Sequence, residues 1–288
     1  MIADGVNWGY KARLASRSAI HAAMDCLNKN LFEKKLQTTK DIFERIRLAI
    51  DAAQKMIVSN EGSLTTLTIS FVCPSSNRRT LVCTAIVGDS NAYVYSRKQR
   101  QIYELTQASR DLNNERDMRL PGGALGMTLD EQADLDNLTY SLMEIDQDDF
   151  VFLTTDGISD NFDPCVSGIG ASIKTPLLAR KSNQSTTTEA SPVLLTAYER
   201  HLGTLDQIRL AIGDNEKDDL YAMDICNRLI QYVIRLTDEQ RQVIEDGVRN
   251  NQGIDGIEKR QFEIEMRNKV GKIPGKLDHA SIVVYRVK

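Results

Sequence analysis

Acidic residues stand at four short turns, each of which borders an apolar segment. These turns hold Asp4, Asp89, Asp156 with Asp160, and Asp278. Magnesium and manganese ions prefer oxygen ligands, and carboxylates fixed at strand ends can supply them. Because Asp-Gly is also a common turn dipeptide, any one of these turns alone is typical of ordinary loop chemistry. Together the four predict an oxygen-only site for divalent metal ions, provided that the strand ends converge.

Alternating apolar and polar residues predict the strands that carry these turns. The stretch "LTTLTISFV" at 64–72 alternates Leu67, Ile69 and Phe71 with Thr and Ser, which is the period of a half-buried strand. Further strands are predicted within 79–106, which holds three, and at 138–145, 150–155 and 280–287. Because the strands from 64 to 155 follow one another without a helix between each pair, the sheets are expected to be antiparallel.

One-sided apolar spacing predicts helices early and late in the chain. The predicted ranges are 12–31, 41–58, 216–236, 237–250 and 257–269. Helices and strands that are separated in this way indicate an α+β fold. The segment 172–192 is rich in Ser and Thr and poor in aromatic residues, which is typical of a flexible insertion. We expect a single domain over 1–288 that carries this insertion.

The composition argues against several kinds of partner. With 36 basic and 40 acidic residues the net charge is −4, so no overall field attracts nucleic acid or an anionic membrane. The chain has no run of about 18 apolar residues, so no membrane span is predicted. Its five cysteines are scattered and without a CxxC pair, which favours reduced thiols in a reducing compartment. We therefore expect a cytoplasmic monomer, with any targeting segment upstream of Met1.

The acidic turns also fall into an ordered series of blocks. In chain order these read "ADG", "GDSNAYVYS", "LT", "VFLTTDGISDN" and "LDHASIVVY". The series resembles the metal-dependent protein phosphatase family, the protein phosphatase 2C-type (PPM) serine/threonine phosphatases, and the "DGV" opening is nearer to that family's "DGVGGW" branch. The resemblance spans essentially the whole chain, and it implies a sandwich of two antiparallel sheets flanked by pairs of helices.

The resemblance also implies a set of metal ligands. Asp4 resembles the aspartate that bridges two Mg²⁺ or Mn²⁺ ions, and the Gly5 carbonyl resembles a ligand of the second ion. Asp156 and Asp278 match the other aspartates of the first ion. Asp89 and Asp160, together with Asp156, match positions that hold a third ion in some members. The implied activity is hydrolysis of phosphoserine and phosphothreonine in proteins, by attack of a metal-activated hydroxide.

Other residues near these motifs have less specific interpretations. His279 stands where the family usually has Asn beside the metal aspartate, so it is a candidate to support the ligands from behind. His21 and His201 are expected to be surface or packing residues. Asp163, which precedes a proline, is expected to serve an ordinary turn.

The chain departs from the family pattern in two places. The family has a segment before the "DG" block that supplies a phosphate-binding Arg and an acidic metal ligand, and Asp4 lies too early for either, so we expect an N-terminally truncated domain. Arg13 and Arg17 follow the block, but they lie in a predicted helix. The usual "LT.DH" block reads "LTQASRDLN". Two hypotheses therefore stand: an active phosphatase, or a pseudophosphatase that acts as a binding or regulatory module.

Overall fold

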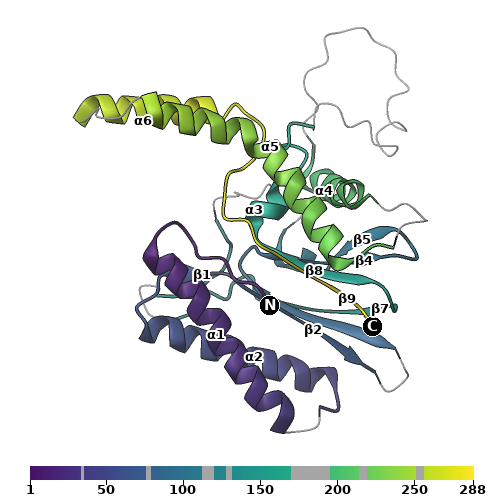
Figure 1. Cartoon of the computed structure of the whole chain (residues 1–288). Helices are drawn as coiled ribbons and strands as arrows, with labels where there is room; N and C mark the ends of the chain where they lie inside the picture. Colours follow the sequence, from purple (N-terminus) through teal and green to yellow (C-terminus); the bar gives the residue numbers. More distant parts are fainter. Residues whose placement is uncertain are drawn as a thin grey trace.

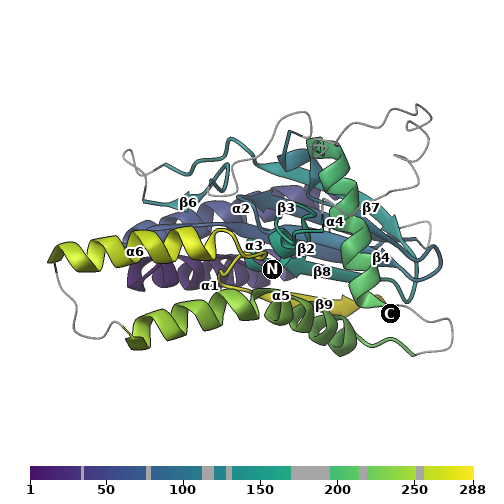
Figure 2. The same cartoon turned by 90° about the horizontal axis from the view of Figure 1, so that it is seen from above.

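The computed structural model shows helices packed on both sides of a pair of β-sheets (Figures 1 and 2). The structure describes residues 1–33, 36–75, 79–111, 120–127, 132–169, 195–213, 219–250 and 256–288. The insertion predicted at 172–192 lies outside these residues.

Every strand pairing in the described residues is antiparallel, as predicted. One sheet has the order β2-β3-β7, with β2 at Leu67–Pro74, β3 at Thr80–Val87 and β7 at Thr139–Ile145. The other has the order β5-β4-β8-β9, with β5 at Gln101–Glu104, β4 at Asn91–Ser96, β8 at Phe150–Thr154 and β9 at Ile282–Arg286. Two short strands, β1 at Leu64–Thr65 and β6 at Leu125–Gly126, form a small separate pair. The sequence did not predict β6.

Successive side chains of β8 point to opposite faces of its sheet, and this alternation shows how the layers pack. Phe150 and Phe152 belong to the apolar cluster that the second sheet shares with two later helices. Val151 and Leu153 point the other way, into the cluster between the two sheets. All four side chains are buried, so β8 is apolar on both faces because both of its faces are covered.

Two early helices cover the outer face of the first sheet. Helix α1 spans Tyr10–Glu33 and helix α2 spans Thr39–Ser59, close to the predicted ranges. Helix α2 begins with a capping box, in which Thr38 and Asp41 satisfy each other's backbone N–H groups. Its predicted apolar face is buried in a cluster with α1, β2 and β3. This helix pair forms one outer layer.

Two of the late helices cover the second sheet, and in this region one prediction was wrong and one helix was missed. Helix α5 is continuous over Ala222–Asn250, although the sequence predicted two helices meeting at 236/237. The Thr237 hydroxyl donates to the Val233 carbonyl, so this polar residue is satisfied inside the helix. Helix α4, at Ala197–Ile212, was not predicted. Helix α6 follows at Gly256–Val270, as predicted.

The order of layers is therefore helix pair, sheet, sheet, helix pair, which confirms the predicted α+β sandwich. No helix in the described ranges is both long and apolar enough to cross a membrane.

Candidate functional site

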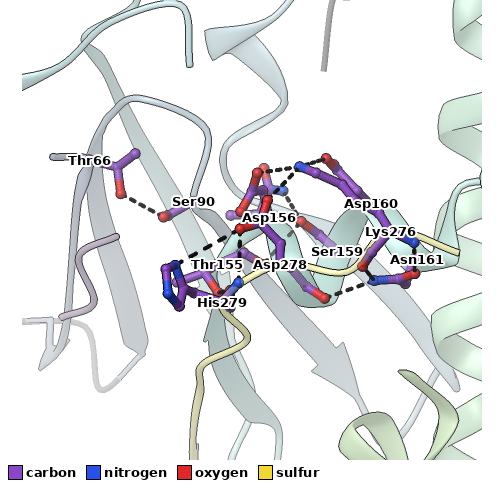
Figure 3. Close-up of polar contacts among 12 residues, drawn as sticks. Thr66, Ser90, Thr155, Asp156, Ser159, Asp160, Asn161, Lys276, Asp278 and His279 are labelled. Carbon is purple, nitrogen blue, oxygen red and sulfur yellow. Dashed lines mark hydrogen bonds and ion pairs between the residues drawn. The ribbon is translucent and has the colours of Figure 1, made fainter. Parts of the chain in front are cut away.

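All four predicted acidic turns meet at one open cavity of about 180 Å³. Its lining includes the predicted ligands Asp4, Gly5, Asp89, Asp156 and Asp278, together with Val6, Asn7, Trp8, Thr66, Pro121 and Lys276. Asp160 lies beside this group and contacts the same lysine as Asp156 (Figure 3). The strand ends therefore converge, as the sequence analysis required.

Asp4 is held by backbone pairing with the start of the first sheet. Its N–H donates to the Thr66 hydroxyl at 3.0 Å, and its carbonyl accepts from the Thr66 N–H at 2.8 Å. Gly5 pairs with Thr65 on the same edge. A Cβ at Gly5 would lie 2.3 Å from the Ala12 carbonyl oxygen in the first turns of α1. Glycine is therefore required at position 5, because the helix backbone approaches the chain directly there.

Asp89 follows a glycine that is fixed on both sides. Gly88 has φ +97°, a value that favours glycine. The Asn137 side chain accepts from the Gly88 N–H at 3.0 Å and donates to the Gly88 carbonyl at 2.7 Å. Next to Asp89, the Ser90 hydroxyl bonds the Thr66 hydroxyl at 2.7 Å, a contact drawn in Figure 3. The Asp89 turn is therefore tied to the strand that holds Asp4.

Asp156 and Asp278 are brought together where the end of β8 meets the approach to β9. The Thr155 hydroxyl donates to the His279 carbonyl at 3.0 Å and accepts from the Ser281 N–H at 2.9 Å. Asp156 begins the short helix α3, Asp156–Ser159. A Cβ at Gly157 would lie 2.2 Å from the His279 carbonyl oxygen, so only glycine allows this close contact.

The ammonium group of Lys276 lies among three of the predicted ligands. Its Nζ is 2.5 Å from Asp156 Oδ2, 2.9 Å from Asp160 Oδ2 and 3.3 Å from Asp278 Oδ2. Burial works against the charge of this lysine, but Asp160 and Asp156 outweigh that effect and raise the pKa of Lys276. Lys276 was not predicted from the sequence, because its only local signal is that it stands two residues before Asp278.

Asp4 has no such cationic partner in the part of the chain that the structure describes. Burial, and then the charges of Asp156, Asp278 and Asp89, raise the pKa of Asp4 to about 7. Its Oδ2 atom is buried and has no hydrogen-bond partner among the described residues. A negative charge on this buried, unpaired oxygen is unfavourable unless a cation or a hydrogen-bond donor binds it.

The chemistry of the donor set fits hard divalent cations. All the side-chain donors are carboxylates, and Asp4, whose Oδ2 atom is buried, lines the same cavity as Asp89, Asp156 and Asp278. In the described ranges, however, no three acidic, His or Cys side chains already enclose a common point at which an ion could sit. Lys276 contacts three of the carboxylates. By the chemistry of their oxygen donors, these residues fit a hard divalent cation.

Two aromatic residues border the same region. The backbone N–H of His279 donates to Asp278 Oδ1 at 2.8 Å, and the His279 ring lies against the Trp8 ring with centroids 4.3 Å apart. Trp8 itself is 73% exposed and lines the cavity. The backbone of His279 thus contacts a predicted ligand, and Trp8 lines the cavity.

Three other residues singled out from the sequence lie away from the cavity. His21 is exposed on α1, and His201 is buried beside Glu104 with a Nδ1–Oε2 distance of 3.3 Å. Asp163 does more than serve a turn, because besides accepting from the Cys165 N–H it forms an ion pair with Arg200 at 3.0 Å.

Comparisons with known proteins bear on the family. No protein-family model matches the chain. The chain is 46% identical over 171 residues to the PP2C-like domain-containing protein CG9801 of Drosophila melanogaster, a match that covers 57% of this chain and 24% of that protein. The chain thus spans about a quarter of the length of this curated relative.

Solved structures provide the comparison of folds. The photosystem II phosphatase PBCP is 14% identical, with a TM-score of 0.53, and the match covers 99% of this chain and 85% of that one. The catalytic domain of the serine/threonine protein phosphatase PstP, in complex with two manganese ions, is 18% identical with a TM-score of 0.42, covering 81% and 79%. The likeness to PBCP shows a shared fold. The sequence match to a PP2C-like protein agrees with this shared fold.

Proposed function

We propose that the chain is a Mg²⁺- or Mn²⁺-dependent protein serine/threonine phosphatase that hydrolyses phosphoserine and phosphothreonine. The observation that carries the proposal is the convergence of Asp4, Asp89, Asp156 and Asp278, from four distant segments, on one cavity. A cavity lined by carboxylates repels a phosphate ester unless cations offset their charge. Divalent ions bound by these carboxylates would reverse the local charge, so that the cavity could bind a phosphate group and support phosphoryl transfer.

The proposed ligand roles follow the resemblance to the metal-dependent phosphatases. Asp4, the Gly5 carbonyl, Asp156 and Asp278 would hold two ions, and Asp89 and Asp160 would contribute to a third. When bound, such ions lower the pKa of water and neutralise charge on the phosphoryl oxygens.

The chain's own residues supply the positioning. Thr155 joins the Asp156 corner to the segment that carries Asp278, and the Thr66–Ser90 hydrogen bond joins the Asp4 and Asp89 segments. The backbone N–H of His279 donates to the Asp278 carboxylate and helps to orient it. The exposed Trp8 ring at the rim offers an apolar surface to the protein segment that bears the phosphate. Phosphoproteins are therefore the proposed substrates, and we propose a cytoplasmic monomer without nucleic-acid or membrane partners.

A pseudophosphatase that acts as a binding or regulatory module is the second candidate, and one observation favours it. The Lys276 ammonium group already neutralises part of the acidic cluster through its contacts with Asp156, Asp160 and Asp278. A protein of this kind could keep its fold and bind partners without metal-dependent turnover.

Hydrolysis of phosphothreonine and phosphoserine peptides by this chain, with Mn²⁺, with Mg²⁺ and with EDTA, separates the two candidates. We expect turnover that requires metal and falls about 100-fold or more in Asp156→Asn, since loss of one charge-stabilising group commonly costs this much. The matched control is Asp25→Asn, an exposed residue of α1 that should keep full activity. Metal binding without turnover would support the pseudophosphatase, and equal rates for the wild type and Asp156→Asn would contradict the phosphatase.

A further inference from the structure

We propose that Lys276 is a tethered cation that competes with divalent metal ions for the carboxylates of the site, so that metal binding requires its displacement. This inference rests on the metal-dependent function proposed above, and it adds a residue that sets the metal affinity.

The geometry singles out Lys276 among the basic residues near the site. Its Nζ lies within 3.3 Å of Asp156, Asp160 and Asp278, from two separate segments of the chain. Its side chain is only 23% exposed, so the ammonium group is largely withdrawn from water. Figure 3 shows it reaching across to the acidic residues of the α3 corner. This is a specific, partly buried ion cluster and not a surface pair.

The backbone of Lys276 is also fixed. Asn161 accepts a hydrogen bond from the Lys276 N–H at 2.8 Å and donates to its carbonyl at 2.9 Å. The Asn161 side chain is fully buried. The base of the lysine is therefore anchored, while its four-carbon stem leaves the ammonium group free to rotate toward or away from the carboxylates.

Charge explains why the ammonium group and a metal ion exclude each other. Carboxylates this close together repel unless a cation lies between them, and Lys276 supplies one positive charge without an external ion. A divalent ion bound to the oxygens of Asp156 and Asp278 would supply two. An ammonium group about 3 Å from the same oxygens would then repel it strongly, so one of the two cations must leave.

The consequence is a protein that tolerates the absence of metal. The wild type should remain folded without divalent ions because Lys276 offsets the repulsion, and it should bind them more weakly than its set of aspartates suggests. Removing the lysine charge should reverse both properties.

The test measures Mn²⁺ binding by titration calorimetry in four variants of the chain. Lys276→Met removes the charge with similar length, and Lys276→Arg keeps the charge. Lys272→Met removes an exposed lysine four residues away, and Asp156→Asn removes a proposed ligand. We expect Lys276→Met to bind Mn²⁺ at least about 10-fold more tightly than the wild type. Lys272→Met should bind like the wild type, and Lys276→Arg no more tightly than it.

Two further readouts do not depend on activity. Without metal, Lys276→Met should unfold at a lower temperature than the wild type, and Mn²⁺ should raise its unfolding temperature more. In the wild type, the Lys276 amine should be protected from an acylating reagent without metal and become labelled when Mn²⁺ is added, as read by peptide mass spectrometry. The labelling measurement holds even where the methionine variant does not fold.

The outcomes distinguish the two proposals. If Lys276→Met binds Mn²⁺ no more tightly than the wild type while Asp156→Asn abolishes binding, the metal site stands and the competing lysine is wrong. Unchanged labelling of Lys276 at saturating Mn²⁺ overturns the competition as well. If neither the wild type nor Lys276→Met binds Mn²⁺, both the metal-dependent function and this inference fail.

Discussion

Asn161 and Lys276 are joined by two hydrogen bonds, one in each direction between the amide side chain and the lysine backbone. The same Asn161 amide also donates to the Gly157 carbonyl at 2.9 Å. One buried side chain therefore connects the α3 corner, which carries Asp156, to the segment that carries Asp278. The contact fixes how far apart these two carboxylates lie.

Asn161→Ala should destabilise the protein by about 2–3 kcal/mol, because it leaves buried backbone groups of Lys276 and Gly157 without partners. It should also weaken Mn²⁺ binding, since the two aspartate segments lose their connection. Chemical denaturation and calorimetry measure these effects. Gln242→Ala is the control, because it removes a hydrogen bond on an exposed helix surface and should change the stability by less than about 0.5 kcal/mol. Equal losses in the two variants would contradict the connecting role of Asn161.

Gly157→Ala should be costly for a different reason. Its Cβ would lie 2.2 Å from the His279 carbonyl oxygen, so the approach to β9 must move away from β8. We expect a loss of about 1–3 kcal/mol in the free energy of unfolding and weaker metal binding. In Gly271→Ala the nearest atom would be the Arg267 carbonyl oxygen at 3.2 Å, so a smaller loss is expected there. Thermal unfolding of both variants gives the comparison, and a fully stable Gly157→Ala would show that this corner can relax.

Asp4 should make the stability of the metal-free protein depend on pH. Its pKa is raised from 3.8 to about 7 in the folded state, first by burial and then by the neighbouring carboxylates. The folded state therefore binds this proton more tightly than the unfolded state, and the resulting stability is present below about pH 4 and lost as the pH rises to about 7. Asp4→Asn should remove this loss and be about 1–2 kcal/mol more stable than the wild type at pH 8, allowing for solvent screening.

Denaturation curves of the EDTA-treated protein at pH 4.5, 6 and 8 test the Asp4 effect. Asp25→Asn, at an exposed position on α1, should follow the wild type at each pH. A wild type and an Asp4→Asn variant with parallel pH profiles would show that Asp4 does not titrate in this range.

Glu104 should be essential for stability although it lies outside the site. It is almost fully buried, pairs with Arg110 and lies 3.3 Å from His201 Nδ1. Burial opposes its charge, but Arg110 and His201 outweigh this and lower the pKa of Glu104. Glu104→Gln should cost about 3 kcal/mol, because it leaves the partner charges without compensation. Glu144→Gln breaks an exposed pair with Arg79 and should cost less than about 1 kcal/mol, as urea denaturation would reveal.

Local patterns predicted those parts of the fold that depend on local physics. The alternation in β2 and the one-sided spacing of α2 follow directly from burial, and both were confirmed. Helix α4 was missed because Gly203 and Thr204, poor helix formers, interrupt its apolar pattern. Its capping box, in which Thr196 and Glu199 bond each other's backbone N–H groups, was the signal that could have revealed it.

The candidate site likewise contains residues that local patterns predict and residues that they do not. The aspartates could be proposed because each stands at a strand end and fits an ordered series of motifs. The role of Lys276 could not be, because it depends on contacts with Asp156 and Asp160 that lie 120 and 116 positions away in the chain. Asn161 and Asn137 were overlooked for the same reason, since their partners are equally distant or on other segments.

The pairing of Asp4 with Thr66, and the anchoring of the Asp278 segment by Thr155, also have a kinetic consequence. The cavity draws its carboxylates from early, middle and late parts of the chain, so it exists only after contacts of high sequence separation have closed, which are slow to form. A partly folded chain presents isolated carboxylates, each a weak ligand by itself. Tight capture of a divalent ion would therefore report that folding of this domain is complete.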